Sequence, residues 1–179
     1  MKLFLVRHGC AGRKLADPRA DLDRPLDDTG RVQAQCVHRW LASHDINGLL
    51  RSSPARRCLE TLRPTADAQH STIAVLDALG PSAAPAPALA ALARERSEHP
   101  DGTDVVACVH GELLVPLLQL CRAHVTARSG APPDDATLLA KGTIWEAHLS
   151  GGRVVQLTHH IPPGLPPCSV HGPGLLASG

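Results

Sequence analysis

The amino-acid sequence predicts an α/β fold, a three-layer α/β/α sandwich with a mostly parallel central sheet. Short apolar runs of strand length alternate along the chain with longer stretches of helical character, which is typical of parallel sheets covered by helices on both faces. Two of these runs end abruptly in a histidine followed by glycine. Residues 1–160 are predicted to form a single domain. The Pro- and Gly-rich residues 161–179 are expected to form a tail that is loose or wraps the surface.

Four apolar runs predict the parallel strands, at residues 2–6, 48–52, 73–76 and 104–109. The first and the last of them have the clearest character of buried strands. Near the C-terminus, residues 143–149 and 153–158 flank a Ser-Gly-Gly segment. That pattern predicts a β-hairpin with a glycine turn.

Four helices are predicted between these strands, over residues 29–43, from residue 55 onward, over 88–98 and over 113–123. Thr29 is the expected N-cap of the first, and one face of that helix carries Val32, Cys36, Val37, Trp40 and Leu41.

Prolines and polar runs mark the expected irregular segments. Pro64 is expected to break or kink the second helix, and Pro116 is compatible only with the first turn of the fourth. Residues 10–28, which contain Pro18 and Pro25, and residues 80–87 are expected to form loops.

Composition narrows the functional classes. Of the 179 residues, 43% are apolar but only 2% are aromatic, so Ala, Val, Leu and Ile must build the core. A net charge of +1 gives no general attraction for nucleic acid or an anionic membrane. No stretch reaches the roughly 18 apolar residues of a membrane span, and the apolar run in residues 1–9 is too short for a signal peptide. A soluble, cytoplasmic protein is expected, with its oligomeric state left open.

The cysteines and one histidine pair are the residues that could form disulfide or metal sites. Six cysteines are scattered without a Cys-x-x-Cys pair, which favours small buried side chains in a reducing cytosol. His159 and His160 have no carboxylate or cysteine at ligand spacing nearby, so a metal site is not expected there.

Polar residues with matching chemistry follow three of the predicted strands. Arg7 and His8 end the first, Arg56 and Arg57 follow the second, and His110 ends the fourth. Ligands of such sheets bind where strand carboxyl ends and helix N-termini meet, so these side chains are expected to form one pocket for a dianion. The planar arginine fork suits phosphate oxygens, and a histidine among such cations is available for attack on phosphorus.

Glycine follows both histidines, as Gly9 and Gly111, and leaves room for a substrate close to the backbone. A lone histidine is more often structural or exposed, and that interpretation is preferred for His38, His44, His99, His124, His148 and His171. The positions of His8 and His110, directly after apolar strands and before glycine, favour a functional role.

These motifs resemble the histidine phosphatase superfamily, also called the phosphoglycerate mutase-like family. The family's Arg-His-Gly signature is present as Arg7-His8-Gly9. Three further motifs are similar in order: Arg24-Pro25-Leu26 with Gly30 and Gln33-Ala34, the segment from Ser52 to Thr61, and that from Val105 to Gly111. Counting from Pro54 assigns the family's arginine to Arg57 and leaves Arg56 as a surface neighbour.

The resemblance implies a phosphoglycerate mutase-like fold and a covalent mechanism. His8 would attack phosphorus and form a phosphohistidine that water then hydrolyses. Arg7, Arg57 and His110, with Gly111 in substrate binding, would hold the phosphoryl oxygens and stabilise the transition state. No metal and no cofactor is implied, because the protein supplies the cations.

One departure from the family concerns the general acid. Many members carry a glutamate after the third strand, whereas residues 76–84 here contain none. Asp77 is the nearest carboxylate and Glu112 is the other possibility, although each also suits a structural role as a strand-end or helix N-terminal charge. Loss of a general acid slows the departure of alcohols by roughly 10²–10⁴-fold. The departure of a phosphoramidate nitrogen would be slowed less.

The short chain, the Arg-Pro-Leu run and the missing glutamate resemble the small bacterial branch that dephosphorylates phosphohistidine on proteins. Residues 141–145 (Lys-Gly-Thr-Ile-Trp) are similar to phosphatase domains that accompany Nudix domains, which suggests nucleotide-like substrates. The leading hypothesis is a metal-independent phosphatase of broad specificity, a hydrolase acting on phosphohistidine, phospholysine or small phosphomonoesters. Its expected partners are phosphorylated small molecules or phosphoproteins.

Two alternatives belong to other classes. A non-catalytic phosphate-binding regulatory protein would keep the pocket but lose a reactive residue, whereas Arg7, His8, Arg57 and His110 are all present. A mutase would need a closing lid and the long insertion that true phosphoglycerate mutases carry after the second strand, and neither is apparent.

Overall fold

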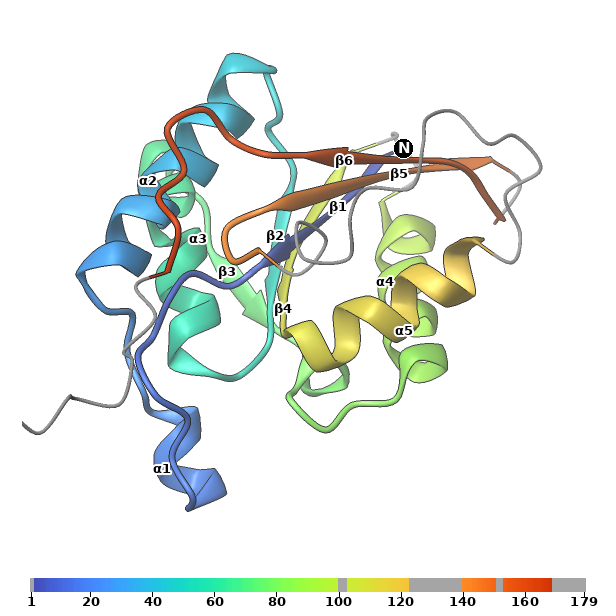
Figure 1. The fold of residues 1–179 in the computed structure, drawn as a ribbon. Coiled ribbons are helices and arrows are strands. Elements are labelled where there is room, and N and C mark those ends of the chain that lie inside the picture. Colours follow the sequence, from blue (N-terminus) through green and yellow to red (C-terminus); the bar gives the residue numbers. More distant parts are fainter. Residues whose placement is uncertain (1, 100–102, 123–139, 151–152, 169–179) are drawn as a thin grey trace, which may run out of the picture.

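The computed structural model describes residues 2–99, 103–122, 140–150 and 153–168. A six-stranded sheet forms its middle layer (Figure 1). The strands follow the order β3 (Ile73–Val75), β2 (Leu49–Ser52), β4 (Val105–Val109), β1 (Lys2–Arg7), β5 (Ile144–Ser150) and β6 (Arg153–His160). All six predicted strands are therefore present.

The pairing confirms a mostly parallel sheet. β1 and β2 both pair in parallel with β4, and β3 pairs in parallel with β2, whereas β5 and β6 run antiparallel to their neighbours. The register places Arg7 beside Val109 and Ser52 beside Cys108, so three strands end at one edge. The glycines of the predicted hairpin turn, residues 151–152, lie outside the described residues.

Helices cover both faces of the sheet. Side chains alternate along β1, so that Phe4 and Val6 face α2 (Asp28–Ser43) and α3 (Arg56–Ala68), whereas Leu3 and Leu5 face α4 (Pro85–Glu98) and α5 (Gly111–Arg122). Each fully buried side chain of this size contributes about 1.5–3 kcal/mol to folding. The predicted three-layer sandwich is confirmed (Figure 1).

A short helix, α1 (Pro18–Leu22), interrupts the region predicted to be irregular. The Asp17 side chain accepts hydrogen bonds from the amides of Arg19 and Ala20, and Pro18 occupies the first turn, where a missing N–H costs nothing. The prediction of an irregular segment over residues 10–28 is therefore wrong for residues 18–22.

The boundaries of α2 also differ from the prediction. Its N-cap is Asp27, which accepts from the amide of Gly30, and not Thr29. Val32, predicted on the buried face, is half exposed, whereas Val37, Trp40 and Leu41 pack against the sheet. The missed residue reflects the drift of a 3.6-residue period along the helix.

Prolines account for three further differences from the prediction. Of the break or kink expected at Pro64, the break is wrong, because α3 continues through that residue. α4 begins at Pro85, with proline in its first turn, so the loop predicted over residues 80–87 is shorter and follows a 3₁₀ turn, η1 (Asp77–Leu79). α5 begins at Gly111, two residues earlier than expected, so Pro116 lies beyond its first turn.

The cysteine prediction is wrong for two of the six residues. Cys10 and Cys168 form a disulfide, although 158 residues separate them in the sequence. Cys36, Cys58, Cys108 and Cys121 are buried free thiols, as expected. Within the described residues, no helix is long and apolar enough to cross a membrane.

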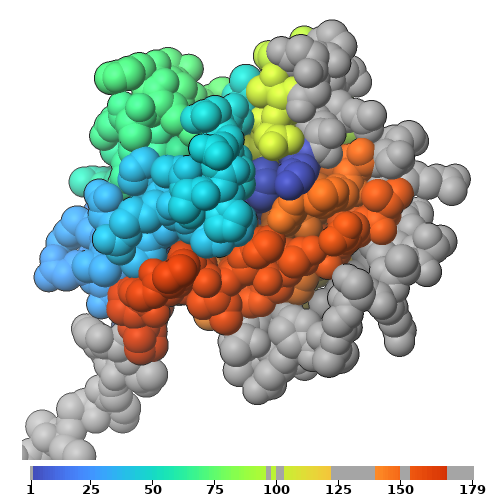
Figure 2. All heavy atoms as spheres, turned by 90° about the horizontal axis from the view of Figure 1, so that it is seen from above, coloured from blue at the N-terminus to red at the C-terminus, as the bar shows by residue number. Residues whose placement is uncertain are grey.

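Residues 161–168 of the predicted tail pack against α2 (Figure 2). The Gln33 side chain donates to the carbonyl of Pro166 over 2.7 Å, and Cys36 Sγ donates to that of Gly164 over 3.5 Å. Residues 169–179 lie outside the described part of the chain.

Candidate active site

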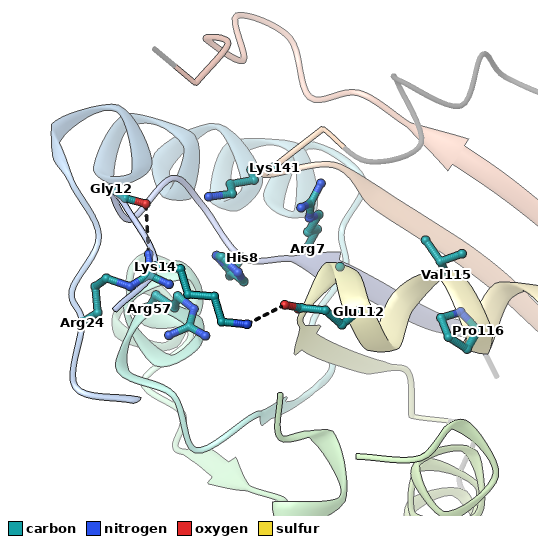
Figure 3. A pocket seen from close by; sticks show the side chains of 11 residues that line it. Arg7, His8, Gly12, Lys14, Arg24, Arg57, Glu112, Val115, Pro116 and Lys141 are labelled. Carbon is teal, nitrogen blue, oxygen red and sulfur yellow. Dashed lines mark hydrogen bonds and ion pairs between the residues drawn. The ribbon is translucent and has the colours of Figure 1, made fainter. Parts of the chain in front are cut away.

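A pocket of about 690 Å³ opens at the carboxyl ends of β1, β2 and β4 (Figure 3). Segments far apart in the sequence contribute its walls: the end of β1, the loop after it, the first turn of α3, the first turns of α5 and the turn before β5. The lining residues are Arg7, His8, Gly12, Lys14, Arg24, Arg57, Gly111, Glu112, Val115, Pro116 and Lys141.

His8 is buried and held in one tautomer. Its Nδ1 lies 2.7 Å from the carbonyl oxygen of Gly9, which can only accept, so Nδ1 carries the proton. Nε2 is then left with a free lone pair. Burial, with smaller contributions from the charges of Arg57 and Lys141, holds the pKa of His8 well below its ordinary value of 6.5. The imidazole is thus neutral and nucleophilic at neutral pH.

This tautomer can be observed directly. Long-range ¹H–¹⁵N spectra are expected to show His8 neutral, with the proton on Nδ1, at pH 6, where an exposed histidine is largely protonated. Because the unfolded chain binds this proton more readily, the free energy of unfolding should also fall as the pH drops below 6.5. A titration midpoint for His8 near 6.5, assigned by the signal lost in His8→Ala, would contradict the buried neutral state.

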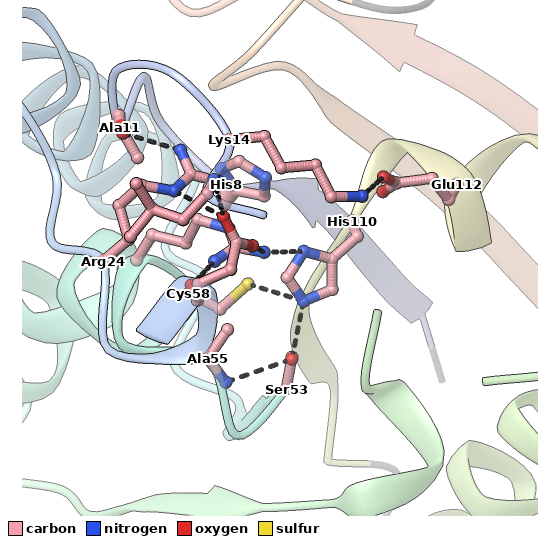
Figure 4. A network of polar contacts seen from close by, with 12 residues as sticks. His8, Ala11, Lys14, Arg24, Ser53, Ala55, Cys58, His110 and Glu112 are labelled. Atoms are coloured by element: carbon pink, nitrogen blue, oxygen red, sulfur yellow. Dashed lines mark hydrogen bonds and ion pairs between the residues drawn. The ribbon is translucent and has the colours of Figure 1, made fainter. Parts of the chain in front are cut away.

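His110 is fully buried beside His8, with 5.2 Å between the ring centroids. Arg57 Nη2 lies 3.3 Å from Nδ1 of His110 and can only donate, so Nδ1 is an acceptor. Nε2 of His110 then carries the proton and donates to Ser53 Oγ over 2.7 Å (Figure 4). Ser53 therefore fixes the orientation of this ring.

Arg57 is anchored by a carboxylate that comes from α1. Asp21 accepts from Arg57 Nη1 through its backbone oxygen (2.6 Å) and pairs with Arg57 Nη2 through Oδ2 (3.2 Å). The other carboxylate oxygen of Asp21 accepts from Arg24 Nε over 2.9 Å. Burial alone would raise the pKa of Asp21, but hydrogen bonds from Arg24 and the Leu15 amide, with the charges of Arg24 and Arg57, lower it to about 2.

Arg7 lies against the backbone at the start of α5. A Cβ at Gly111 would come within 2.8 Å of Arg7 Nη2, so glycine at this position lets the guanidinium lie where it does. Arg7 Nε is buried and has no hydrogen-bond partner among the described residues. A buried donor of this kind is costly until an acceptor such as a phosphate oxygen satisfies it.

The loop that carries His8 is held by α2 and α3. Thr61 Oγ1 accepts from the amide of Gly9 over 3.0 Å, and Gln33 Oε1 accepts from that of Cys10 over 2.8 Å. A Cβ at Gly30 would lie 1.9 Å from the Cys10 carbonyl oxygen, so glycine is needed for α2 to approach the loop. These contacts leave His8 little freedom to move.

The structure brings Arg7, His8, Arg57 and Gly111 into one pocket, with His110 directly behind. The two candidate acids differ. Asp77 begins η1 and is not among the lining residues, whereas Glu112 lines the pocket and pairs with Lys14 over 3.2 Å. Burial raises the pKa of Glu112, but its own backbone amide and Lys14 outweigh this and lower it. Glu112 is therefore deprotonated, which does not suit a general acid.

Sequence reasoning missed Asp21, Lys14 and Ser53, and gave Arg24 and Lys141 no role of their own in the site. One local signal was available, because Asp21 and Arg24 are three residues apart with opposite charges. Arg56, expected at the surface, is exposed and pairs with Glu60. Within the described ranges, no group of three or more His, Cys, Asp or Glu is placed to hold a metal ion.

Comparison with known proteins gives a family match and a relative in sequence. Residues 3–80 match the model of the histidine phosphatase superfamily (branch 1). The chain is 28% identical over 161 residues to an 8-oxo-(d)GTP phosphatase of Mycolicibacterium smegmatis, covering 90% of this chain and 48% of that protein. The chain thus spans about half the length of that relative.

Solved structures share the fold. The protein histidine phosphatase SixA complexed with tungstate superposes with a TM-score of 0.67 at 23% identity, covering 90% of this chain and 95% of the other. A mycobacterial glucosyl-3-phosphoglycerate phosphatase superposes with a TM-score of 0.63 at 16% identity, covering 89% and 97%. At these identities the likeness establishes the fold.

Proposed function

Through residues 3–80 the chain belongs to the histidine phosphatase superfamily, and on that premise we propose that it is a metal-independent phosphatase with His8 as the nucleophile. The observation that carries the proposal is the tautomer of His8. Its Nδ1 proton is engaged by Gly9 in a pocket lined by arginines, which leaves Nε2 free to attack.

The proposed reaction has two steps. Nε2 of His8 forms a bond to phosphorus while the bond to the leaving group breaks, and the leaving group departs with the electron pair. Water then attacks the phosphohistidine, releasing inorganic phosphate and restoring neutral His8. Arg7 and Arg57 stabilise the charge on the phosphoryl oxygens in both steps, and His110 supports them by accepting a hydrogen bond from Arg57 Nη2.

We propose N-phosphorylated amino acids (phosphohistidine or phospholysine) or small phosphomonoesters as substrates, free or carried on a protein. The state of Glu112 supports the first class, since its carboxylate is deprotonated and paired with Lys14. The nitrogen of a phosphoramidate can be protonated by solvent before the P–N bond breaks and then leaves as a neutral group, so it depends less on a general acid than an alcohol that must leave as an alkoxide. The fold likeness to a protein histidine phosphatase is consistent with this choice.

A second candidate is a nucleotide phosphatase. It is favoured by the relative from Mycolicibacterium smegmatis, which aligns over 90% of this chain and acts, by its name, on an oxidised guanine nucleotide. The non-catalytic alternative would keep phosphate binding without turnover. It is disfavoured by the orientation of His8, which serves attack on phosphorus and is not needed for holding an anion.

The proposal is tested by assaying the full chain with EDTA against p-nitrophenyl phosphate, phosphohistidine, phospholysine, sugar phosphates and guanosine mono-, di- and triphosphate. Activity on at least one substrate is expected to survive EDTA. Phosphoramidates should exceed sugar phosphates in kcat/KM by about 10²-fold or more, the contribution a general acid makes for alcohols. Loss of all activity in EDTA, restored by a divalent cation, would overturn metal independence. Complete inactivity on the panel would favour the binding-protein alternative.

We also propose a single catalytic domain over residues 1–160 and a cytoplasmic location. Four buried free thiols are consistent with a reducing compartment. In such a compartment the Cys10–Cys168 pair would be a dithiol for much of the time.

A further inference from the structure

The pocket holds more positive charge than one phosphoryl group requires. Five basic side chains line it, namely Arg7, Lys14, Arg24, Arg57 and Lys141, with one carboxylate, Glu112. Asp21 lies behind this wall and pairs with both Arg24 and Arg57. Five positive charges against two negative ones leave a net charge of +3. A phosphomonoester carries about −1.5 to −2 at neutral pH, so roughly one positive charge remains unbalanced.

Lys141 is the side chain that best accounts for this excess. Arg24 and Arg57 pair with Asp21, and Lys14 pairs with Glu112. In the part of the chain that the structure describes, Lys141 has no carboxylate within ion-pair distance. It is half-buried, and burial together with the charges of Arg7, Arg24 and Arg57 lowers its pKa, which the charge of Asp27 opposes only in part. A bound anion would relieve this repulsion.

The position of Lys141 is built into the fold. The next residue, Gly142, donates its amide to the carbonyl of Arg7 over 3.0 Å, and the amide of Arg7 donates to the carbonyl of Thr143 over 3.0 Å. Gly142 has φ +78°, and a Cβ at this position would lie 2.8 Å from Leu165 Cδ1, so the turn favours glycine. Lys141 is thereby tied to the backbone beside His8 and faces the same pocket as Arg7 (Figure 3).

We propose that Lys141 forms a second anion subsite, which binds a negatively charged group of the substrate adjacent to the phosphoryl group that His8 receives. Substrates with two neighbouring phosphates, such as nucleoside diphosphates and triphosphates, have this chemistry, and a monoester with a single phosphate lacks it. The inference rests on the proposed function for its catalytic meaning. Binding of two linked phosphate groups can be measured without turnover.

The test uses two phosphonates that a phosphatase does not cleave. Methylphosphonate supplies one anionic group and methylenediphosphonate supplies two. Isothermal titration calorimetry of the full chain with EDTA is expected to give binding of the diphosphonate about 10- to 100-fold tighter than that of the monophosphonate, the range for one charge-assisted contact. Lys141→Met, which keeps the aliphatic stem, should reduce this preference to about twofold or less. Lys141→Arg should restore most of it.

A matched control is available in Lys2→Ala, because Lys2 lies outside the pocket and pairs with Glu146. That variant removes the same charge from the protein and should keep the wild-type preference. Equal affinity of the wild type for the two phosphonates, or a preference unchanged in Lys141→Met, would overturn the subsite. Hydrolysis of p-nitrophenyl phosphate by the same samples tests the phosphatase separately, since the two results can fail independently.

Discussion

Replacing His8 with alanine is expected to lower kcat for p-nitrophenyl phosphate by on the order of 10⁴–10⁶-fold, because the covalent route is lost entirely. The side chain is buried with Nε2 free, and nothing else among the pocket-lining residues is a neutral nucleophile. Steady-state assay of purified wild type and variant at pH 7 measures the effect directly.

Rapid quenching gives an independent readout of the same proposal. Wild-type protein mixed with ³²P-labelled substrate should carry label that resists alkali and is lost in acid, as a phosphoramidate bond does, and His8→Ala should carry none. His70→Asn is the matched control, since His70 is exposed and has φ 49°, which asparagine tolerates. Equal activity in wild type and His8→Ala would show that the nucleophile is wrong.

Replacing Asp21 with alanine is expected to lower the free energy of unfolding by about 3–5 kcal/mol at pH 7, the loss typical of breaking a buried ion pair from one side. The side chains of Arg57 and Asp21 are only 4% and 7% exposed. The backbone oxygen of Asp21 still accepts from Arg57, so the arginine stays near its place but is less rigidly oriented. A fall in kcat/KM of about 10²-fold should therefore accompany the loss of stability.

The stabilisation that Asp21 provides is expected to depend on pH. The pKa of Asp21 is about 2 in the folded protein, below its ordinary value of 3.8, so its contribution is complete above pH 4 and is lost as the pH falls toward 2. The difference between wild type and Asp21→Ala in urea denaturation should shrink over that window. Asp23→Ala, an exposed change two residues along the chain, should be neutral within about 0.5 kcal/mol. A constant difference down to pH 2 would contradict the ion-pair explanation.

Local sequence patterns determined the sheet and the core of the site. Apolar runs such as residues 105–109 can only be satisfied in a buried strand, and the residues that end them must then lie at one edge of a parallel sheet. For that reason the sequence was enough to predict Arg7, His8, His110 and the Arg56-Arg57 pair as one group, and the family resemblance then selected Arg57. Their individual roles stay proposals that the experiments above test.

Helix ends were harder to predict because proline favours the first turn of a helix but disfavours its interior. Pro18 and Pro85 lie in first turns, where they favour a helix, and Pro64 and Pro116 lie further inside. Only the path of the neighbouring chain distinguishes the two cases. The error at Pro18 hid α1, and with α1 it hid Asp21, the carboxylate that holds Arg57.

What the sequence determined by itself is therefore the six strands and the four long helices, the motifs that resemble a family, and the candidate site residues that directly follow strands. These depend on periodicity and on neighbours along the chain. Only the tertiary structure decided that Asp21 anchors Arg57, that Cys10 meets Cys168 and that Lys141 lies on the pocket beside Arg7. The first two contacts join residues that are 36 and 158 positions apart in the sequence. The position of Lys141 is fixed by backbone hydrogen bonds that join its turn to Arg7. No local pattern encodes such contacts, because packing of the whole chain brings the partners together.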